Sequence, residues 1–565
     1  MARPWVFGNT TVRTALRLKD GLAALATSGY IGIVEGKNES KFARALHAAG
    51  VVELSESTKD VSSIARKWRG AMTKLGFLIP KVTPVSGVQQ SQIGAKFTIT
   101  PNGQRLLEAN TTPAIQEVFL RAISAIQVPS PTDRNFEVAA FSPLRHTLAI
   151  MLRLERLTGS PHLDFIEMAT VVQLSSPEHG LAEIADAVLS LRVQREGALN
   201  KKKFDRECLK ACASEHGLKW GTYFDYADLN FRYLKATGVV QNKGRGISIV
   251  PEHRVLVERI AAQPELSLTP AEYFLRLFNG AALPTDEQSA ALVVLESLQE
   301  IASSRGVGID LSQRNLDTPS DISIVRFELE ELIFHSKEED YASEQATRID
   351  EILAVMTLIN ERKGSLKLGN GQEVSVPTNE MPAYFEWVLW RAFLAIRHHV
   401  TKPHEIRRFK IDQDFLPIGT AAGGGADVVV EFEDYVVAVE VTLTESSRQE
   451  AAEGEPVRRH VADLVKKYEI PGKAVYGLFI AKRIDSNTAE TFRIGVWYRS
   501  DDSKLIVDIV PLTLGQFRTF IKEMFDSGSV HPNKLRELLD DITQLRNESD
   551  GAPEWKQRIS ESISG

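Results

Sequence analysis

The chain has 565 residues, a mass of 62.7 kDa and a formal net charge of −7. At roughly 100–200 residues per domain, about three to five domains are expected. A hydrophobic content of 43%, a charged content of 25% and a mean hydropathy of −0.15 exclude a collagen, a mostly disordered chain and a disulfide scaffold.

The sequence carries the signs of a cytoplasmic protein. No apolar run approaches the roughly 18 residues of a membrane helix, and the start lacks a signal-peptide core. The two cysteines, Cys208 and Cys212, are typical of a reducing compartment. Their spacing without a second pair favours core packing over a zinc site. We therefore expect an intracellular protein with no membrane partner.

Charge is unevenly distributed along the chain. Residues 1–105 contain 15 Lys and Arg against 6 Asp and Glu, and residues 192–245 contain 12 against 6. Residues 281–375 contain 8 against 18. Basic segments inside an acidic protein indicate surfaces that face a polyanion. Chance clustering of solvated charge is the alternative.

The two basic segments resemble each other. The first combines an amphipathic helix within residues 62–80 with a closing helix within 96–109, and the second repeats this order at 228–241 and 247–258. A constant spacing of 150 residues indicates an internal duplication. The aligned pairs are Ile99 and Ile249, Pro101 and Pro251, Leu106 and Leu256, and Glu108 and Glu258. The pattern is typical of the winged helix, a DNA-binding module.

Basic side chains in these segments are the candidates for DNA contacts. The helix before the wing would enter the major groove in the first copy, and the wing itself would reach DNA in the second. The candidates are Arg66, Lys67, Arg69 and Lys74 in the first copy and Lys243 and Arg245 in the second. The alternative is a pair of protein-interaction winged helices, and the local charge favours DNA.

The remaining sequence separates into an acidic helical part and a mixed part. Residues 281–375 contain acidic amphipathic helices, for example at 343–362, and predict a helical linker. After Pro377 helices and strands mix, which predicts an α/β domain. The expected elements are a helix at 381–399, β-prone runs at 427–432 and 435–443, a helix at about 446–468 and a strand at 474–481.

The two β-prone runs predict a hairpin that carries acids at one end. With Glu433 and Asp434 in the turn, paired residue numbers sum to 867, so Asp427 lies opposite Glu440. Two carboxylates at the end of a half-buried sheet repel each other, and a magnesium or manganese ion would relieve this. Glu-Asp is not a usual two-residue turn, so a longer loop could shift the register. The alternative for Glu440 is an ordinary charge on an edge strand.

The sequence also resembles a known family. Asp427 followed by Glu440-Val441-Thr442 is similar to the site of the PD-(D/E)XK nuclease superfamily, except that Ala426 replaces the usual proline and Thr442 the usual lysine. The chain resembles the AlwI-type restriction endonucleases, type IIS enzymes with nicking relatives, over nearly its whole length. The similar segments are residues 4–13, 385–393, 423–432, 439–449 and 453–461.

The resemblance implies roles for individual residues. Asp427, Glu440, Glu386 and the carbonyl of Val441 would hold Mg²⁺, with Mn²⁺ as a substitute. Glu453 matches the family glutamate that stands in for the missing lysine, and Glu455 is the rival for that role. His460 matches a family histidine near the site, and a surface or capping histidine is the alternative reading.

The resemblance also implies a multidomain α+β architecture. It combines two winged-helix recognition subdomains (1–125 and 126–280), an acidic helical linker (281–375) and an α/β PD-(D/E)XK nuclease domain (376–565). The expected enzyme is a magnesium-dependent type IIS restriction endonuclease that binds a short asymmetric duplex sequence. It hydrolyses phosphodiester bonds at a fixed distance outside that sequence and leaves a 5′-phosphate and a 3′-hydroxyl.

Several alternatives remain open. The chain could be a strand-specific nicking endonuclease or the large subunit of a heterodimeric restriction enzyme. It could also be a non-cleaving DNA-binding regulator, or a repair or transposition nuclease that reads DNA structure. Expected partners are double-stranded DNA, a second copy or a small nuclease subunit, and a cognate DNA methyltransferase of the same prokaryotic restriction-modification system.

Overall fold

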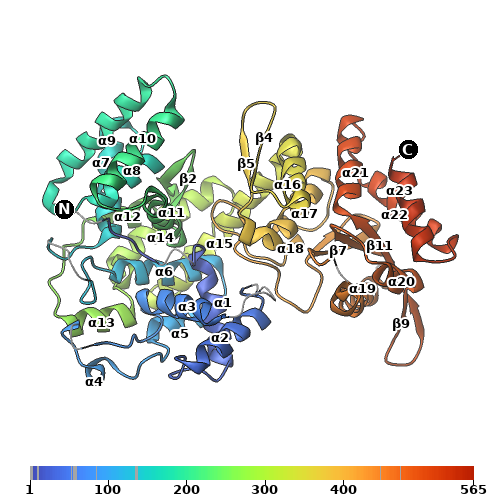
Figure 1. The fold of residues 1–565 in the computed structure, drawn as a ribbon, viewed down its shortest axis with the longest axis horizontal. Helices are drawn as coiled ribbons and strands as arrows, with labels where there is room; N and C mark the ends of the chain where they lie inside the picture. Colours follow the sequence, from blue (N-terminus) through green and yellow to red (C-terminus); the bar gives the residue numbers. More distant parts are fainter. Residues whose placement is uncertain are drawn as a thin grey trace. The chain divides into compact units, whose positions relative to one another are not determined.

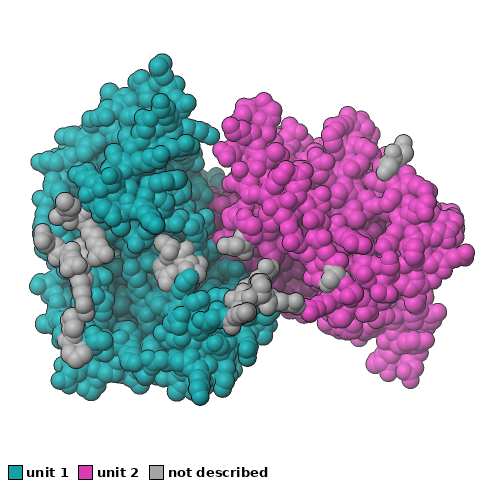
Figure 2. Space-filling view, in the orientation of Figure 1, with its two compact units in different colours: residues 1–333 teal, residues 334–565 magenta. Residues whose placement is uncertain are grey.

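The computed structural model describes residues 4–8, 12–52, 54, 60–83, 86–133, 138–445, 447–470 and 472–564. Residues 9–11 and Ser446, which belong to two of the family-like segments, lie outside this set. The chain divides into two compact units, Met1–Ile333 and Phe334–Gly565 (Figure 2). The division lies inside helix α15 (Pro319–Glu344) and therefore within the segment expected to be a linker.

The described part of unit 1 is mostly helical and contains one small antiparallel sheet in the order β1-β3-β2 (Figure 1). Its strands are β1 (Leu163–Asp164), β2 (Val240–Lys243) and β3 (Gly246–Ile249). Its helices before α15 are α1 (Leu18–Thr27), α2 (Lys37–Ala48), α3 (Ser62–Lys74), α4 (Gln90–Ile93), α5 (Pro101–Glu108), α6 (Thr112–Ala125), α7 (Pro143–Thr158), α8 (Phe165–Thr170), α9 (Leu181–Glu196), α10 (Lys201–Glu215), α11 (Trp220–Ala236), α12 (Arg254–Ala261), α13 (Pro270–Asn279) and α14 (Gln288–Ser304).

The two duplicated segments have the same local backbone plan. Helices α3 and α11 are each followed by a glycine with positive φ, Gly76 at 73° and Gly238 at 74°. Two residues later each chain pairs with a returning strand, Leu78 with Ile99 and Val240 with Ile249. A helix then follows each returning strand. The shared pairing therefore agrees with the internal repeat that the sequence predicts.

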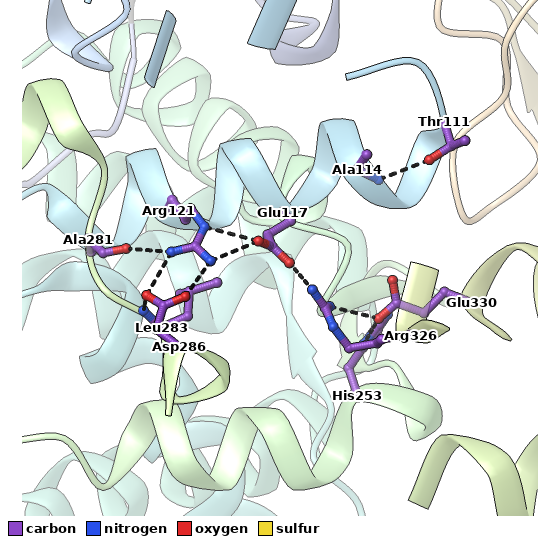
Figure 3. Close-up of polar contacts among 10 residues, drawn as sticks. All are labelled: Thr111, Ala114, Glu117, Arg121, His253, Ala281, Leu283, Asp286, Arg326 and Glu330. Atoms are coloured by element: carbon purple, nitrogen blue, oxygen red, sulfur yellow. Dashed lines mark hydrogen bonds and ion pairs between the residues drawn. The ribbon is translucent and has the colours of Figure 1, made fainter. Parts of the chain in front are cut away.

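A buried charge network links three parts of unit 1 (Figure 3). Glu117 of α6 accepts hydrogen bonds from Arg121 at 2.9 and 3.0 Å and from Arg326 of α15. Arg121 also binds Asp286 at 2.6 and 2.9 Å. Burial raises the pKa of Glu117, but the charges of Arg326 and Arg121 outweigh it and lower that pKa below its usual value. The network fixes the start of α15 on α6.

Unit 2 contains the four-stranded mixed sheet that forms the core of the predicted α/β part. The strand order is β11-β8-β7-β6, with β6 antiparallel to β7 and the other neighbours parallel. Its strands are β4 (Ser365–Lys367), β5 (Glu373–Ser375), β6 (Val428–Glu431), β7 (Tyr435–Thr442), β8 (Ala474–Ala481), β9 (Val496–Tyr498), β10 (Lys504–Ile506) and β11 (Asp508–Thr513). Its helices after α15 are α16 (Ile349–Glu361), α17 (Met381–Ile396), α18 (Pro403–Ile406), α19 (Glu455–Tyr468), α20 (Ser486–Ile494), α21 (Leu514–Asp526), α22 (Pro532–Asn547) and α23 (Ala552–Ser564).

Helix α17 and strand β7 form the centre of unit 2. Residues 383–396 of α17 are all buried, as are residues 435–440 of β7. Helix α17 packs against β6 and β7, and α19 packs against β7 and β8. Strand β7 has neighbouring strands on both sides and is buried on both faces. Its sequence is therefore a continuous apolar run, YVVAV.

The structure differs from two expectations about the acidic segment. The helix expected at 343–362 is divided, because α15 ends at Glu344, a 3₁₀ turn covers Gln345–Arg348 and α16 begins at Ile349. Strands β4 and β5 form an antiparallel hairpin where helix was expected. No helix in the described part of the chain is long and apolar enough to cross a membrane.

Candidate active site

The β6–β7 hairpin has the register that the sequence predicts. Val428 pairs with Val439 and Glu431 with Val436, so each pair sums to 867. The amide of Phe432 donates to the carbonyl of Tyr435 at 2.8 Å, which closes a two-residue turn. The Glu-Asp turn therefore keeps the register despite its unusual composition. Its ladder brings Asp427, just before β6, next to the far end of β7.

Asp427 and Glu440 meet at the carboxyl end of β7. One carboxylate oxygen of Asp427, Oδ2, accepts a hydrogen bond from the amide of Val441 at 3.0 Å. Glu440 precedes Val441 and is only 7% exposed. Since β7 lies between β6 and β8, Glu440 is on a central strand and is not an edge-strand charge. Ligand sites of α/β sheets typically lie at this end of parallel strands.

Glu386 reaches the same place from helix α17. Its Oε2 accepts a hydrogen bond from the amide of Ala421 at 2.6 Å, so the glycine-containing loop before β6 holds this carboxyl group. The side chain is buried, with 5% of its surface exposed. A carboxylate on a largely apolar helix needs such a partner, because an unpaired buried charge is costly.

The acids perturb one another. Burial raises the pKa of Glu386 well above its usual value, and the negative charges of Asp427 and Glu440 raise it further. Burial and the charge of Glu440 together raise the pKa of Asp427 to about 8, although the Val441 amide opposes this. These directions mean that the ionised cluster has too little positive charge nearby to offset its burial and mutual repulsion. A divalent cation with hard oxygen ligands matches that deficit.

The carboxylates of the cluster are not already arranged as ligands around a metal ion. Among the residues that the structure describes, no three His, Cys, Asp or Glu side chains are arranged as a ready metal site. Two of the acids are instead held by the amides of Ala421 and Val441. Carboxylates that crowd and repel each other in a buried position still fit a divalent cation by their chemistry.

His460 contacts one of these acids directly. Its Nδ1 lies 2.6 Å from Oε1 of Glu440, and its ring is buried against the sheet by helix α19. Its other nitrogen, Nε2, is buried without a hydrogen-bond partner. His460 therefore belongs to the interior of the acidic cluster, and the alternative of a surface or capping histidine does not describe its position.

Glu453 and Glu455 occupy different environments. A hydrogen bond from the Thr442 hydroxyl lowers the pKa of Glu453, but burial and the charge of Glu440 outweigh it and raise that pKa. Glu453 lies in a short π-helix, Glu450–Gly454, which precedes α19. Glu455 is exposed and pairs with Arg459 at 3.0 Å. Of the two candidates, Glu453 is the one beside the acidic cluster.

Arg408 is a site residue that the sequence pattern did not reveal. Its amide donates to the Asp427 carbonyl at 3.2 Å, and its Nη2 lies 3.3 Å from the carbonyl of Gly423. Its charge lowers the pKa of both Asp427 and Glu386. The sequence offered one signal for such a neighbour, the glycine run before Asp427. A glycine at position 425 leaves room for another group to approach the backbone closely.

The predicted DNA-contact residues divide into inner and outer groups. The Lys74 ammonium donates to the carbonyl of Val6 at 2.7 Å, and burial lowers its pKa. Arg69 pairs with Glu39 at 2.9 Å and lies over the ring of Phe97. The outer group is exposed and consists of Arg66, Lys67, Lys243 and Arg245.

The outer group also has intramolecular contacts. Arg66 lies 3.3 Å from Glu39, and Arg245 lies 2.9 Å from Asp205. Lys243 lies 3.3 Å from the Ser160 hydroxyl. The basic side chains are exposed in these contacts, but the acids Glu39 and Asp205 are buried.

Comparisons with known proteins identify a matching family and similar solved structures. The family model described as AlwI restriction endonuclease matches residues 73–520. No curated protein matches significantly. Among solved structures, the small subunit (R.BspD6I2) of the heterodimeric restriction endonuclease R.BspD6I is similar at 27% identity, covering 37% of this chain and 97% of that chain, with a TM-score of 0.29. Restriction endonuclease FokI is similar at 13% identity, covering 95% and 99%, with a TM-score of 0.24.

Proposed function

The chain belongs to the AlwI restriction endonuclease family, and from that premise we propose that it is a divalent-metal-dependent type IIS endonuclease. It binds a short asymmetric sequence in duplex DNA and cuts at a fixed distance outside it. The observation that carries this proposal is the gathering of Glu386, Asp427 and Glu440 at the carboxyl end of β7, where the pKa values of Glu386 and Asp427 are raised.

The proposed metal ligands are the carboxylates of Asp427, Glu440 and Glu386 and the carbonyl of Val441. Mg²⁺ is the expected ion, and Mn²⁺ has the same preference for oxygen. A bound divalent cation supplies positive charge that polarises water and the phosphate and offsets the crowded carboxylates. The raised pKa values of Asp427 and Glu386 support a site that accommodates such a charge.

The chain's own residues then have distinct tasks. Glu453 accepts a proton from the attacking water, and Thr442 holds Glu453 in place. His460 orients Glu440 through the 2.6 Å contact. The water oxygen bonds to phosphorus as the bond from phosphorus to the 3′-oxygen breaks. The leaving 3′-oxygen takes a proton from solvent water, so the products are a 5′-phosphate and a 3′-hydroxyl.

We propose the four-part organisation on the same basis. Residues 1–125 and 126–280 are winged-helix recognition subdomains, which the shared pairing after Gly76 and Gly238 supports. Strands β2 and β3, which follow helix α11 and pair with each other, suit a wing in the second copy. Residues 281–375 link them to a PD-(D/E)XK nuclease domain at 376–565.

One acidic cluster cuts one strand. Double-strand cleavage therefore requires a second copy of the chain or a small nuclease subunit, and without either the enzyme nicks. A cognate DNA methyltransferase protects the host sequence in the same cytoplasmic restriction-modification system.

Plasmid cleavage tests the proposal. We expect discrete linear or nicked products with Mg²⁺ and none with EDTA, and sequenced ends at one constant distance from a common sequence. Glu440→Gln keeps size and hydrogen bonding but removes the charge, so it should bind DNA and not cleave it. Wild-type protein that binds DNA specifically and leaves it intact with Mg²⁺ and Mn²⁺ would favour a non-cleaving regulator. Cleavage without a fixed offset would favour a nuclease that reads DNA structure.

A further inference from the structure

Arg408 has a buried nitrogen with no partner beside the acidic cluster. Its Nη1 is buried and has no hydrogen-bond partner, whereas Nη2 lies 3.3 Å from the Gly423 carbonyl. The guanidinium as a whole is half-buried, and a donor without a partner is costly to bury, so this nitrogen is available to a ligand. The nearby charges are Asp427 and Glu386, and neither carboxylate accepts from Nη1.

Other arginines in unit 2 show what a structural role looks like. Arg407, the preceding residue, binds both oxygens of Glu338 at 2.7 and 2.8 Å. Arg391 pairs with Glu351 at 2.7 Å, although its Nη2 is also buried without a hydrogen-bond partner. Each guanidinium is matched to a carboxylate, which is the geometry that this group favours. Arg408 lies within electrostatic reach of two acids and still makes no such pair.

The backbone around Asp427 fixes the position of Arg408. The segment pairs with β6 through Arg407 and Val428, and the Arg408 amide donates to the Asp427 carbonyl at 3.2 Å. The glycine loop provides the space for the side chain. A Cβ atom at Gly425 would lie 2.4 Å from Nη1 of Arg408, so any larger residue would displace the guanidinium.

The acidic cluster lacks the lysine that its sequence pattern usually has. Thr442 occupies that position, and its hydroxyl hydrogen-bonds with Glu453. A glutamate can accept a proton but cannot stabilise the negative charge that develops on phosphate during attack. A fixed guanidinium can, because planar N–H donors match phosphate oxygens and carry charge.

We propose that Arg408 is a catalytic residue that binds the scissile phosphate through Nη1 and stabilises its added charge in the transition state. This proposal rests on the proposed nuclease function. It divides the work of the missing lysine between Glu453, which takes the proton, and Arg408, which supplies the charge. Gly425 is then a positioning residue, since its lack of a side chain gives Arg408 its place.

Four variants test this: Arg408→Gln, Arg408→Lys, Gly425→Ala and, as a control that removes an arginine charge elsewhere, Arg558→Gln. Arg558 pairs with Glu554 at 2.7 Å on the terminal helix α23. Single-turnover cleavage is measured at saturating Mg²⁺, and specific DNA binding is measured in Ca²⁺. We expect Arg408→Gln to slow cleavage about 100- to 1,000-fold, as for loss of a transition-state donor. Arg408→Lys and Gly425→Ala should fall between this variant and wild type, and Arg558→Gln should match wild type.

A binding measurement separates phosphate contact from simple charge balance. Duplexes with a neutral methylphosphonate at the mapped cleavage position are compared with normal duplexes in Ca²⁺. Wild type should lose about 10-fold in affinity for the neutral duplex, and Arg408→Gln should discriminate less than about 3-fold. If Arg408 only balances the acids, Arg408→Gln should tighten Mn²⁺ binding, keep full discrimination and cleave normally at saturating metal.

The outcomes distinguish this inference from the function on which it rests. Wild-type cleavage that Glu440→Gln abolishes, together with near-normal cleavage by Arg408→Gln, would overturn the role of Arg408 alone. A wild-type protein that never cleaves would overturn both. If Arg408→Gln fails to fold, Gly425→Ala decides, because its clash is with the flexible end of one side chain.

Discussion

The Thr442 hydroxyl is hydrogen-bonded to the carboxyl group of Glu453. Thr442 ends strand β7, two residues after Glu440, and Glu453 lies in the π-helix that precedes α19. This hydrogen bond brings a fourth acid to the cluster from a separate element. It also gives a geometric reason to choose between two glutamates that are only two positions apart.

Glu453→Gln should therefore impair cleavage, and Glu455→Gln should not. Removing the proton acceptor should slow single-turnover cleavage by about 100-fold or more, the usual contribution of a general base. Glu455 only pairs with Arg459 at the surface, so its variant should stay within about 2-fold of wild type. Rates at saturating Mg²⁺ check this. Equal losses in both variants would contradict the assignment.

The salt dependence of DNA binding should separate the outer basic residues from the inner ones. Removing one side chain that binds a phosphate reduces the slope of log affinity against log salt by about 0.9. Arg66→Ala, Lys67→Ala and Arg245→Ala should each reduce this slope. Lys74→Met should lower the melting temperature and leave the slope unchanged, because Lys74 donates to the Val6 carbonyl. A reduced slope for folded Lys74→Met would show that Lys74 reaches DNA.

Breaking the network in Figure 3 should destabilise unit 1 strongly. Glu117→Gln removes one of the two acids that neutralise the buried Arg326, which keeps only Glu330 at 3.0 Å. Loss of one partner of a buried charge costs up to about 3–5 kcal/mol. Glu207→Gln, in an exposed pair with Lys203 at 3.8 Å, should cost less than about 1 kcal/mol. Urea unfolding followed by circular dichroism measures both. Similar losses for the two variants would contradict a buried, cooperative network.

Stability of unit 1 should fall as the pH drops from 7 to 5. Burial, assisted by the charge of His179, lowers the pKa of His146 from 6.5 to about 4 in the folded chain. Between these values the unfolded chain binds a proton that the folded chain does not, so unfolding becomes easier at lower pH. The loss at pH 5 is about 2 kcal/mol.

The variant His146→Gln tests this pH dependence. Glutamine cannot take up the proton but retains a polar atom for Ser175, which now lies 2.8 Å from the imidazole. Melting temperatures at pH 5, 6 and 7 should show a smaller fall for this variant than for wild type. His47→Gln, at an exposed position, is the control. An unchanged fall in His146→Gln would remove His146 as the cause.

Local pattern was enough to predict the hairpin and its acids. Alternation with period two and a short turn determine the pairing, so the register that joins Val428 to Val439 follows from the sequence, as does strand Ala474–Ala481. The same reasoning could not place β7 in the middle of the sheet. That position depends on parallel pairing with β8, which no neighbouring residue encodes.

Charge alone was a poorer guide to side-chain direction. Arg69 and Lys74 lie in a basic stretch, but Glu39 of α2 and the Val6 carbonyl take them as partners. Those partners come from segments distant in sequence. Arg408 escaped prediction for the same reason, since only folding brings it beside Asp427 and the glycine loop.

The burial of β7 on both faces has a consequence for how activity is lost on heating. Amide hydrogens of a central, covered strand exchange with solvent only when the whole cooperative unit opens. Glu440 and Thr442 belong to that strand, so small local openings cannot separate them. Residual activity should therefore follow the main melting transition of this unit as one all-or-none step, with deuterium uptake at β7 rising at the same temperature.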